Sequence, residues 1–242
     1  MELYNGSCLK ILPSLQTKFS AIIADPPYQK LNKKCGWDNL INIDKMWDCL
    51  LPLCYDTTPI ILFSQEPYTS MLITSQPKLF KYKLYWHKTH PTGHLNAQKQ
   101  PMRNIEEIVV FYKKQCTYNP QKTQGHKPCN SFTKTVKMAN NTLCYGTTSK
   151  EITGGGNTDR YPTQLLKFPS DKQTLNLHPT QKPIALMEWL VKTYTNEGDT
   201  VLDFCMGSGT TGVACKNFNR YFVGIELMKE YFDKARIRLE SR

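Results

Sequence analysis

The sequence predicts an α/β fold, a doubly wound and mainly parallel sheet, in a single domain over residues 1–242 with an irregular insertion at 95–171. Two observations lead to this prediction. Short, continuously apolar runs recur along the chain, and such runs are typical of strands buried on both faces of a sheet. Segments with helical periodicity lie between several of them, and this alternation is typical of parallel sheets.

The predicted strands are short and mostly β-branched, and they cover residues 21–24, 59–63, 84–86, 108–111, 200–203 and 221–225. The predicted helices cover residues 44–53, 184–194, 210–217 and 228–239. From about residue 113 to 171 the chain is instead rich in Gln, Lys, Asn, Thr, Gly and Pro, which favours irregular structure over core.

The composition favours a soluble, intracellular protein that attracts polyanions. The formal charge of +11 comes from 31 Lys+Arg against 20 Asp+Glu, and such an excess draws nucleic acids by releasing their counterions. A basic surface that only confers solubility is the alternative. We expect no signal peptide and no membrane span. The nine cysteines match no zinc spacing, even in the nearest set of Cys116, His126, Cys129 and Cys144, so no metal is predicted.

The strongest local signal is the tetrapeptide Asp25-Pro26-Pro27-Tyr28, directly after the predicted strand 21–24. Ligands of open α/β sheets bind beyond the carboxyl ends of the strands. The Asp25 carboxylate and the Pro26 carbonyl can each accept one N–H of a base amine, which frees its conjugated lone pair for an electrophilic methyl group. The prolines hold those acceptors rigidly, and Tyr28 offers an aromatic face to an extruded base. A Pro-Pro turn that Asp25 caps locally is the alternative.

A second signal runs from Asp203 to Thr211, after the predicted strand 200–203. Gly207 and Gly209 allow a tight turn and a close approach of a ligand, but the segment matches neither a phosphate loop nor a dinucleotide fingerprint. Glu226 ends the next strand, where a carboxylate can accept both ribose hydroxyls of a nucleoside. Alone it would more often be a solvated charge or a helix cap. Together these features favour a nucleoside cofactor.

These motifs, with His178-Pro179-Thr180-Gln181-Lys182-Pro183, resemble the β class of the N4/N6 DNA amino-methyltransferases, of the adenine-N6 type. The catalytic tetrapeptide comes first, the target-recognition segment in the middle and the cofactor motifs last, as in that class. The resemblance covers about residues 5–239. It implies a site-specific methyltransferase of DNA and a sheet of the S-adenosylmethionine-dependent methyltransferase type.

The resemblance also implies residue roles. The catalytic residues are Asp25, Pro26, Pro27 and Tyr28, and the insertion 95–171 is the target-recognition region. The residues expected to bind S-adenosylmethionine, with Glu226 on its ribose, are Ser7, Cys8, Ala24, Asp25, His178, Thr180, Gln181, Lys182, Asp203, Phe204, Gly207, Ser208, Gly209, Thr210, Thr211 and Glu226.

Two positions depart from the family pattern. Ser7 replaces the acid of the usual Gly-Asp pair, so its contact with the cofactor adenine is weakened, and Cys205 replaces the usual Phe before the glycine turn. For DNA, the expected contacts are Lys88, His94, Lys99, Arg103 and Arg160, although each has an ordinary exposed charge as its alternative.

Several alternatives stay open. The acid at the first position of the tetrapeptide favours adenine over the N4 amine of cytosine, while RNA base methylation and a non-catalytic nucleic-acid-binding role are further possibilities. Cytosine-5 chemistry is set aside, because its Pro-Cys dipeptide would have to be Pro128-Cys129 in the loop-like insertion. The expected partner is double-stranded DNA. The resemblance also suggests a homodimer and a cognate restriction enzyme. The expected location is the cytoplasm of a prokaryotic cell or its virus.

Overall fold

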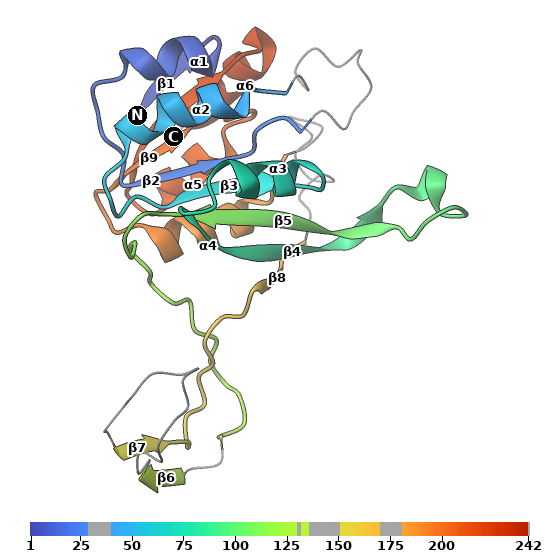
Figure 1. Cartoon of the computed structure of the whole chain (residues 1–242), viewed down its shortest axis with the longest axis vertical. Coiled ribbons are helices and arrows are strands. Elements are labelled where there is room, and N and C mark those ends of the chain that lie inside the picture. Colours follow the sequence, from blue (N-terminus) through green and yellow to red (C-terminus); the bar gives the residue numbers. More distant parts are fainter. Residues whose placement is uncertain (29–39, 130–131, 136–150, 170–180, 242) are drawn as a thin grey trace. The chain divides into compact units, whose positions relative to one another are not determined.

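A central sheet with helices on both faces organises the chain (Figure 1). The computed structural model describes residues 1–28, 40–129, 132–135, 151–169 and 181–241. The sheet has eight strands in the order β1-β10-β9-β2-β3-β5-β4-β8. These strands are β1 (Glu2–Asn5), β2 (Ala21–Ala24), β3 (Ile60–Ser64), β4 (Phe80–Thr92), β5 (Arg103–Phe111), β8 (Leu165–Lys167), β9 (Thr200–Asp203) and β10 (Tyr221–Glu226).

The strand directions confirm the predicted doubly wound, mainly parallel sheet. Strands β1, β10, β9, β2 and β3 are parallel neighbours, whereas β5 runs antiparallel to both β3 and β4, and β8 is parallel to β4. Strand β3 follows β2 in the sequence and lies on one side of it in the sheet, whereas β9, much later in the sequence, lies on the other side. The strand order therefore reverses between β2 and β9, and such a switch point is where open α/β sheets bind ligands.

Helices cover the two faces in two groups. On one face lie α1 (Cys8–Ile11), α2 (Ile43–Leu50) and α3 (Tyr68–Ser75), and on the other lie α4 (Ile184–Tyr194), α5 (Thr210–Asn217) and α6 (Lys229–Glu240). Short 3-10 turns occupy Leu12–Ser14, Leu51–Leu53 and His94–Asn96. In β2, Ile22 and Ala24 face the first group while Ile23 faces the second, as the two-residue period of a strand requires. No helix in the described part of the chain has the length and apolar character to cross a bilayer.

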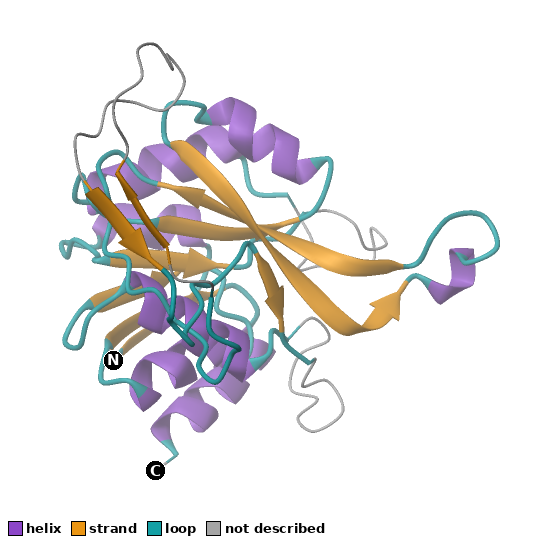
Figure 2. Cartoon of the chain, turned by 90° about the horizontal axis from the view of Figure 1, so that it is seen from below, coloured by secondary structure: helices purple, strands orange, loops and turns teal. Residues whose placement is uncertain are grey.

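Strands β4 and β5 form a long hairpin that projects beyond the other strands in both views (Figures 1 and 2). Only residues 84–86 of β4 are apolar enough to predict a strand, but β4 runs for 13 residues. Its outer end, residues 89–92, is exposed on both sides, and Thr92 pairs there with Arg103. Without a face to bury, this part of the strand has no apolar signature.

The chain divides into two compact units, Met1–Asn119 with Thr163–Arg242, and Pro120–Pro162. Strand β5 belongs to the first unit, so this part of the predicted insertion 95–171 is a central strand. The second unit contains the antiparallel pair β6 (Phe132–Thr135) and β7 (Glu151–Gly154). Its described side chains include Lys122, which lies 2.8 Å from Asp159 and 4.3 Å from the centre of the Tyr161 ring.

Gly209, at the start of α5, gives the first testable prediction. Its φ is +76°, and a Cβ there would lie 3.1 Å from Leu239 Cδ1 and 3.2 Å from Ala235 Cβ of α6. The left-handed backbone alone costs an alanine about 1–2 kcal/mol, and crowding in a packed interior adds about 1–3 kcal/mol. Gly198, with φ +83° and open space around it, is the matched control. In urea unfolding, Gly209→Ala should lower the free energy of unfolding more than Gly198→Ala does, and equal losses would contradict this packing argument.

Candidate active site

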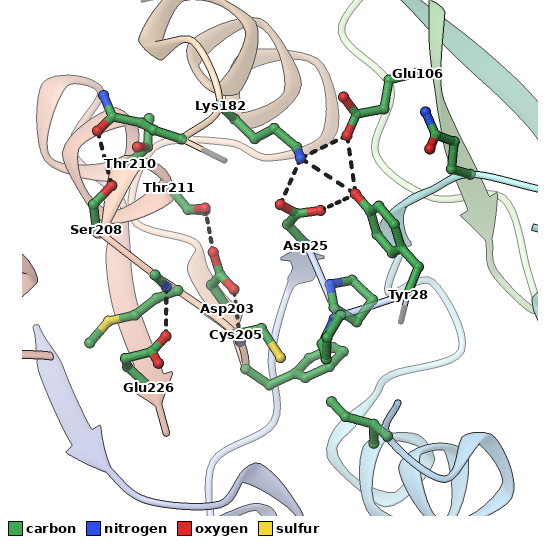
Figure 3. A pocket seen from close by; sticks show the side chains of 18 of the residues that line it. Asp25, Tyr28, Glu106, Lys182, Asp203, Cys205, Ser208, Thr210, Thr211 and Glu226 are labelled. Carbon is green, nitrogen blue, oxygen red and sulfur yellow. Dashed lines mark hydrogen bonds and ion pairs between the residues drawn. The ribbon is translucent and has the colours of Figure 1, made fainter. Parts of the chain in front are cut away.

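A cavity of about 720 Å³ lies where the segments after β2, β9 and β10 come together (Figure 3). The parallel register sets Ile22 of β2 beside Leu202 of β9, so both strands end at the same edge of the sheet. The predicted site residues that line the cavity are Ser7, Cys8, Asp25, Pro26, Pro27, Tyr28, Lys88, Arg103, Gln181, Lys182, Asp203, Phe204, Gly207, Ser208, Thr210, Thr211 and Glu226.

Other predicted residues lie elsewhere. Ala24 is fully buried within β2, and Gly209 packs against α6 as described above. His178 and Thr180 lie outside the described residues. Neither Ala24 nor Gly209 is part of the cavity lining in the described residues.

The Asp25 carboxylate is held on both of its oxygens (Figure 3). The Tyr28 hydroxyl donates to Oδ1, and the Lys182 ammonium donates to Oδ2 at 2.6 Å. The Tyr28 ring also stacks on Tyr68 of α3, with ring centroids 5.8 Å apart. Residues 25–28 are therefore held by a hydrogen bond within the tetrapeptide, by an ion pair from the segment before α4 and by a ring contact from α3.

Glu106 of β5 is a site residue that the sequence analysis missed. Its Oε1 lies 2.8 Å from Lys182 Nζ and 3.1 Å from the Tyr28 hydroxyl, and its Oε2 lies 2.6 Å from Lys88 Nζ. A signal was present, because two consecutive acids in a strand must face opposite sides of the sheet. Glu107 faces the other side, where it pairs with Lys83 at 2.7 Å.

Burial and ion pairing compete at these groups. Burial raises the pKa of Asp25, helped by the Glu106 carboxylate and opposed by Lys182. Burial also works against ionisation of Glu106, but Lys182 and Lys88 outweigh it and lower its pKa to about 2. The pKa of Lys182 is raised because its two carboxylate partners overcome the effect of burial. Glu106 and Lys182 are therefore charged near neutral pH.

The cofactor side of the cavity carries acids without lysines. Asp203 accepts hydrogen bonds from Thr211 Oγ1 at 2.5 Å and from the Cys205 amide at 3.0 Å. None of the ion pairs found in the described residues involves it. Burial accordingly raises the pKa of Asp203 to about 7. A ligand that brings a positive charge to this carboxylate would remove the cause of that shift.

Two further groups complete the fit to an amino-acid and nucleoside ligand. The buried Gln181 Nε2 has no partner among the described residues, while its Oε1 accepts from Ser208 Oγ at 3.2 Å. Glu226 accepts from the Gly207 amide at 2.9 Å and from the Met228 amide at 2.8 Å, which fixes its carboxylate at the end of β10. An α-ammonium suits Asp203, an α-carboxylate suits the free Gln181 donor, and ribose hydroxyls suit Glu226.

The candidate DNA contacts are spread over both units. Lys88 and Arg103 line the cavity, but Lys88 is paired with Glu106 and Arg103 donates to Gln65 at 3.1 Å. His94 and Lys99 lie in the connection between β4 and β5 and are exposed. Arg160 belongs to the second unit, where it donates to the carbonyls of Asn157 and Asp159.

Comparison with known proteins identifies the family. The model of the DNA methylase family of N6/N4 methyltransferases matches residues 19–236. The chain belongs to this family. It is 28% identical over 251 residues to the type II methyltransferase M.HpaI of Haemophilus parainfluenzae, covering 98% of this chain and 73% of that protein.

Solved structures agree with this assignment. The M1.HpyAVI–SAM complex superposes with a TM-score of 0.70 at 26% identity and covers 99% of both chains. The cytosine-N4-specific PvuII DNA methyltransferase shares the fold, with a TM-score of 0.65 at 16% identity over 99% of this chain and 86% of that one. The chain is therefore a DNA methyltransferase that uses S-adenosylmethionine, as its motifs predicted. The described residues contain no group of three or more His, Cys, Asp or Glu able to hold a metal ion.

Asp203 gives a prediction with a defined pH dependence. Its folded-state pKa of about 7 is above the ordinary 3.8. As pH rises from about 4 to 7, the unfolded chain ionises this carboxyl while the fold keeps it protonated, so the free energy of unfolding falls. The α-ammonium of the cofactor, which stays protonated to about pH 8, binds the ionised Asp203 carboxylate more strongly than the protonated carboxyl. Calorimetric titration should therefore show tighter cofactor binding at pH 7.5 than at pH 6.

Asp203→Asn should flatten this pH dependence and weaken cofactor binding by at least about tenfold. Without the cofactor, the same variant should melt at or above the wild-type temperature at pH 8, since the cost of burying a charge is gone. A variant that loses stability but keeps its affinity would contradict the role of this carboxylate.

Proposed function

We propose that this chain transfers a methyl group from S-adenosylmethionine to the N6 amine of adenine at specific sites in double-stranded DNA. The observation that carries this proposal is the position of Asp25, which directly follows β2 and lines the same cavity as Asp203, Gln181 and Glu226. A hydrogen-bond acceptor for a base amine thus lies beside groups that fit the methyl donor.

In the proposed mechanism, the cofactor supplies a methyl group on a sulfonium. Asp25 and the Pro26 carbonyl accept the two N–H groups of an extruded adenine, and the Tyr28 ring stacks on the base. A carboxylate has about four lone-pair sites, so Asp25 can accept the amine while it keeps the bonds to Lys182 and Tyr28. The amine nitrogen is thereby oriented for direct displacement, and the developing positive charge lies beside a carboxylate.

The acid in the first position of the tetrapeptide favours adenine. The main alternative is the N4 amine of cytosine, because the same fold serves the cytosine-N4-specific PvuII enzyme. Methylation of an RNA base is a further alternative, whereas the intact acceptor and cofactor groups argue against a non-catalytic role. The net charge of +11 supports a polyanionic substrate. We extend the proposal to a homodimer and a cognate restriction enzyme as partners, in the cytoplasm of a prokaryotic cell or its virus.

The direct test of this function is transfer of labelled methyl from S-adenosylmethionine to unmethylated genomic DNA, followed by digestion and nucleoside analysis. We expect the label in N6-methyladenine. Label in N4-methylcytosine would overturn the choice of base and leave the chemistry intact. No label in DNA, with label in RNA, would transfer the proposal to RNA.

Asp25→Ala should separate catalysis from cofactor binding. Loss of the acceptor should reduce methyl transfer by at least about 100-fold, the scale seen when one group that stabilises developing charge is removed. Cofactor affinity should stay near wild type, since the cofactor groups are on β9, β10 and the segment before α4. The matched control is Asp56→Ala, whose carboxylate pairs with Lys113 and Lys114 on the surface. Equal loss of transfer and cofactor binding would contradict the division of roles.

A further inference from the structure

We propose that Glu106 is a positioning residue for methyl transfer, because it fixes the Lys182 ammonium and through it the Asp25 carboxylate that accepts the target amine. This inference rests on the proposed function of Asp25. Glu106 lies outside every motif that marks the family in this sequence. Its role follows from contacts between strand β5, the loop after β2 and the segment before α4 (Figure 3).

The geometry makes Lys182 a bridge between two carboxylates. Its ammonium lies 2.6 Å from Asp25 Oδ2 and 2.8 Å from Glu106 Oε1, and it also lies 4.9 Å from the centre of the Phe63 ring. Only 8% of the Lys182 side chain and 7% of the Glu106 side chain are exposed. A long lysine side chain with one anchor would rotate freely, but with two carboxylates and a ring face it has one position.

Lys88 holds Glu106 in the same way from the other side. Its ammonium lies 2.6 Å from Glu106 Oε2 and 5.0 Å from the centre of the Trp86 ring. Both oxygens of Glu106 are thus engaged by ammonium groups, and its pKa of about 2 keeps it ionised near neutral pH. Glu106 is therefore poorly suited to take the proton that the methylated amine releases, and its role is to hold charge and geometry.

The charges explain why a second acid is needed. When Asp25 is ionised, Asp25 and Glu106 balance Lys182 and Lys88, and the four side chains together carry no net charge. Without the charge of Glu106, two buried ammonium groups would face one carboxylate. That excess positive charge would oppose the charge that develops on the amine during transfer, in a site where burial strengthens such effects.

The ionisation of Asp25 reports on this arrangement. The groups that act on its carboxylate are Lys182, Tyr28 and Glu106. Asp203 of β9 and Tyr68 of α3, which stacks on Tyr28, also interact with its charge. Among these, the negative charge of Glu106 raises the pKa of Asp25. Replacing it with a neutral group should lower that pKa, since Lys182 then pairs with Asp25 alone.

The experiment compares Glu106→Gln with Glu107→Gln, its neighbour on the opposite face of β5. Single-turnover methyl transfer is measured against pH, and the Asp25 carboxyl carbon is titrated by NMR in the protein without substrate. For Glu106→Gln we expect the transfer rate to fall by at least about tenfold, the effect of a misplaced reacting group, with unchanged cofactor affinity. The acidic limb of the rate profile and the Asp25 titration should both move to lower pH. Glu107→Gln should match the wild type in both.

The outcomes separate the two proposals. Wild-type rates with an unmoved Asp25 titration in Glu106→Gln would overturn the inference, as would a slower rate with no shift of the acidic limb, which is the result of a merely structural role. If the wild type methylates no DNA but the titration still shifts, the proposed function fails and the coupling of Glu106 to Asp25 stands. If Glu106→Gln does not fold, the double variant Glu106→Gln/Lys88→Met removes one acid and one lysine, so the charges of Asp25 and Lys182 still balance. A shift of its Asp25 titration to lower pH would support the inference, and an unmoved titration would overturn it.

Discussion

The parallel pairing of β2 with β9 is the constraint on which the site depends. These strands come from opposite ends of the chain, yet their register sets Ile22 beside Leu202 at the point where the strand order reverses. Because the two strands are parallel, the loops that follow them begin at the same edge of the sheet. One loop carries the proposed acceptor for the target amine and the other carries the proposed cofactor turn. Under this proposal, the distance between methyl donor and acceptor is set by the spacing of two neighbouring strands.

Four buried or partly buried acids line the resulting cavity, and the fold treats them in two ways. Asp25 and Glu106 are paired with lysines, whereas the donors that Asp203 and Glu226 receive from the described residues are hydroxyl and amide groups. This difference matches the ligands, because the cofactor carries positive charge and a target base is neutral. Asp203, which has no cationic partner among the described residues, can attract the positively charged cofactor. Asp25, which is paired with Lys182, can accept a neutral base without attracting a second cation. Burial raises the pKa of Asp203 to about 7, so keeping this acid without a cationic partner opposes its ionisation in the protein without ligand.

The elements nearest the site were also the easiest to predict. Strands 21–24 and 200–203 and helices 184–194 and 210–217 coincide with the observed elements, because Pro, Gly or Asp directly adjoins each of them on at least one side. The outer end of β4 carries no such signal, since residues 89–92 are exposed on both sides. Glu106 was missed for a different reason: its partners Lys182 and Lys88 come from distant segments, and only the completed sheet brings them together. A motif identifies residues that act through their local backbone, but not those that act through a tertiary contact.

Lys182 shows the same limit from the opposite direction. The motif around it predicts a cofactor contact, and Lys182 does line the cavity. A long side chain can reach several groups, however, and its ammonium lies among Asp25, Glu106 and the Tyr28 hydroxyl, at 2.6, 2.8 and 3.4 Å. An ammonium has three donors in a tetrahedral arrangement, which suits three oxygens converging from different segments. The planar fork of an arginine suits a single carboxylate instead. The choice of lysine therefore follows from its place between two acids and a phenol, and it links the orientation of residues 25–28 to strand β5.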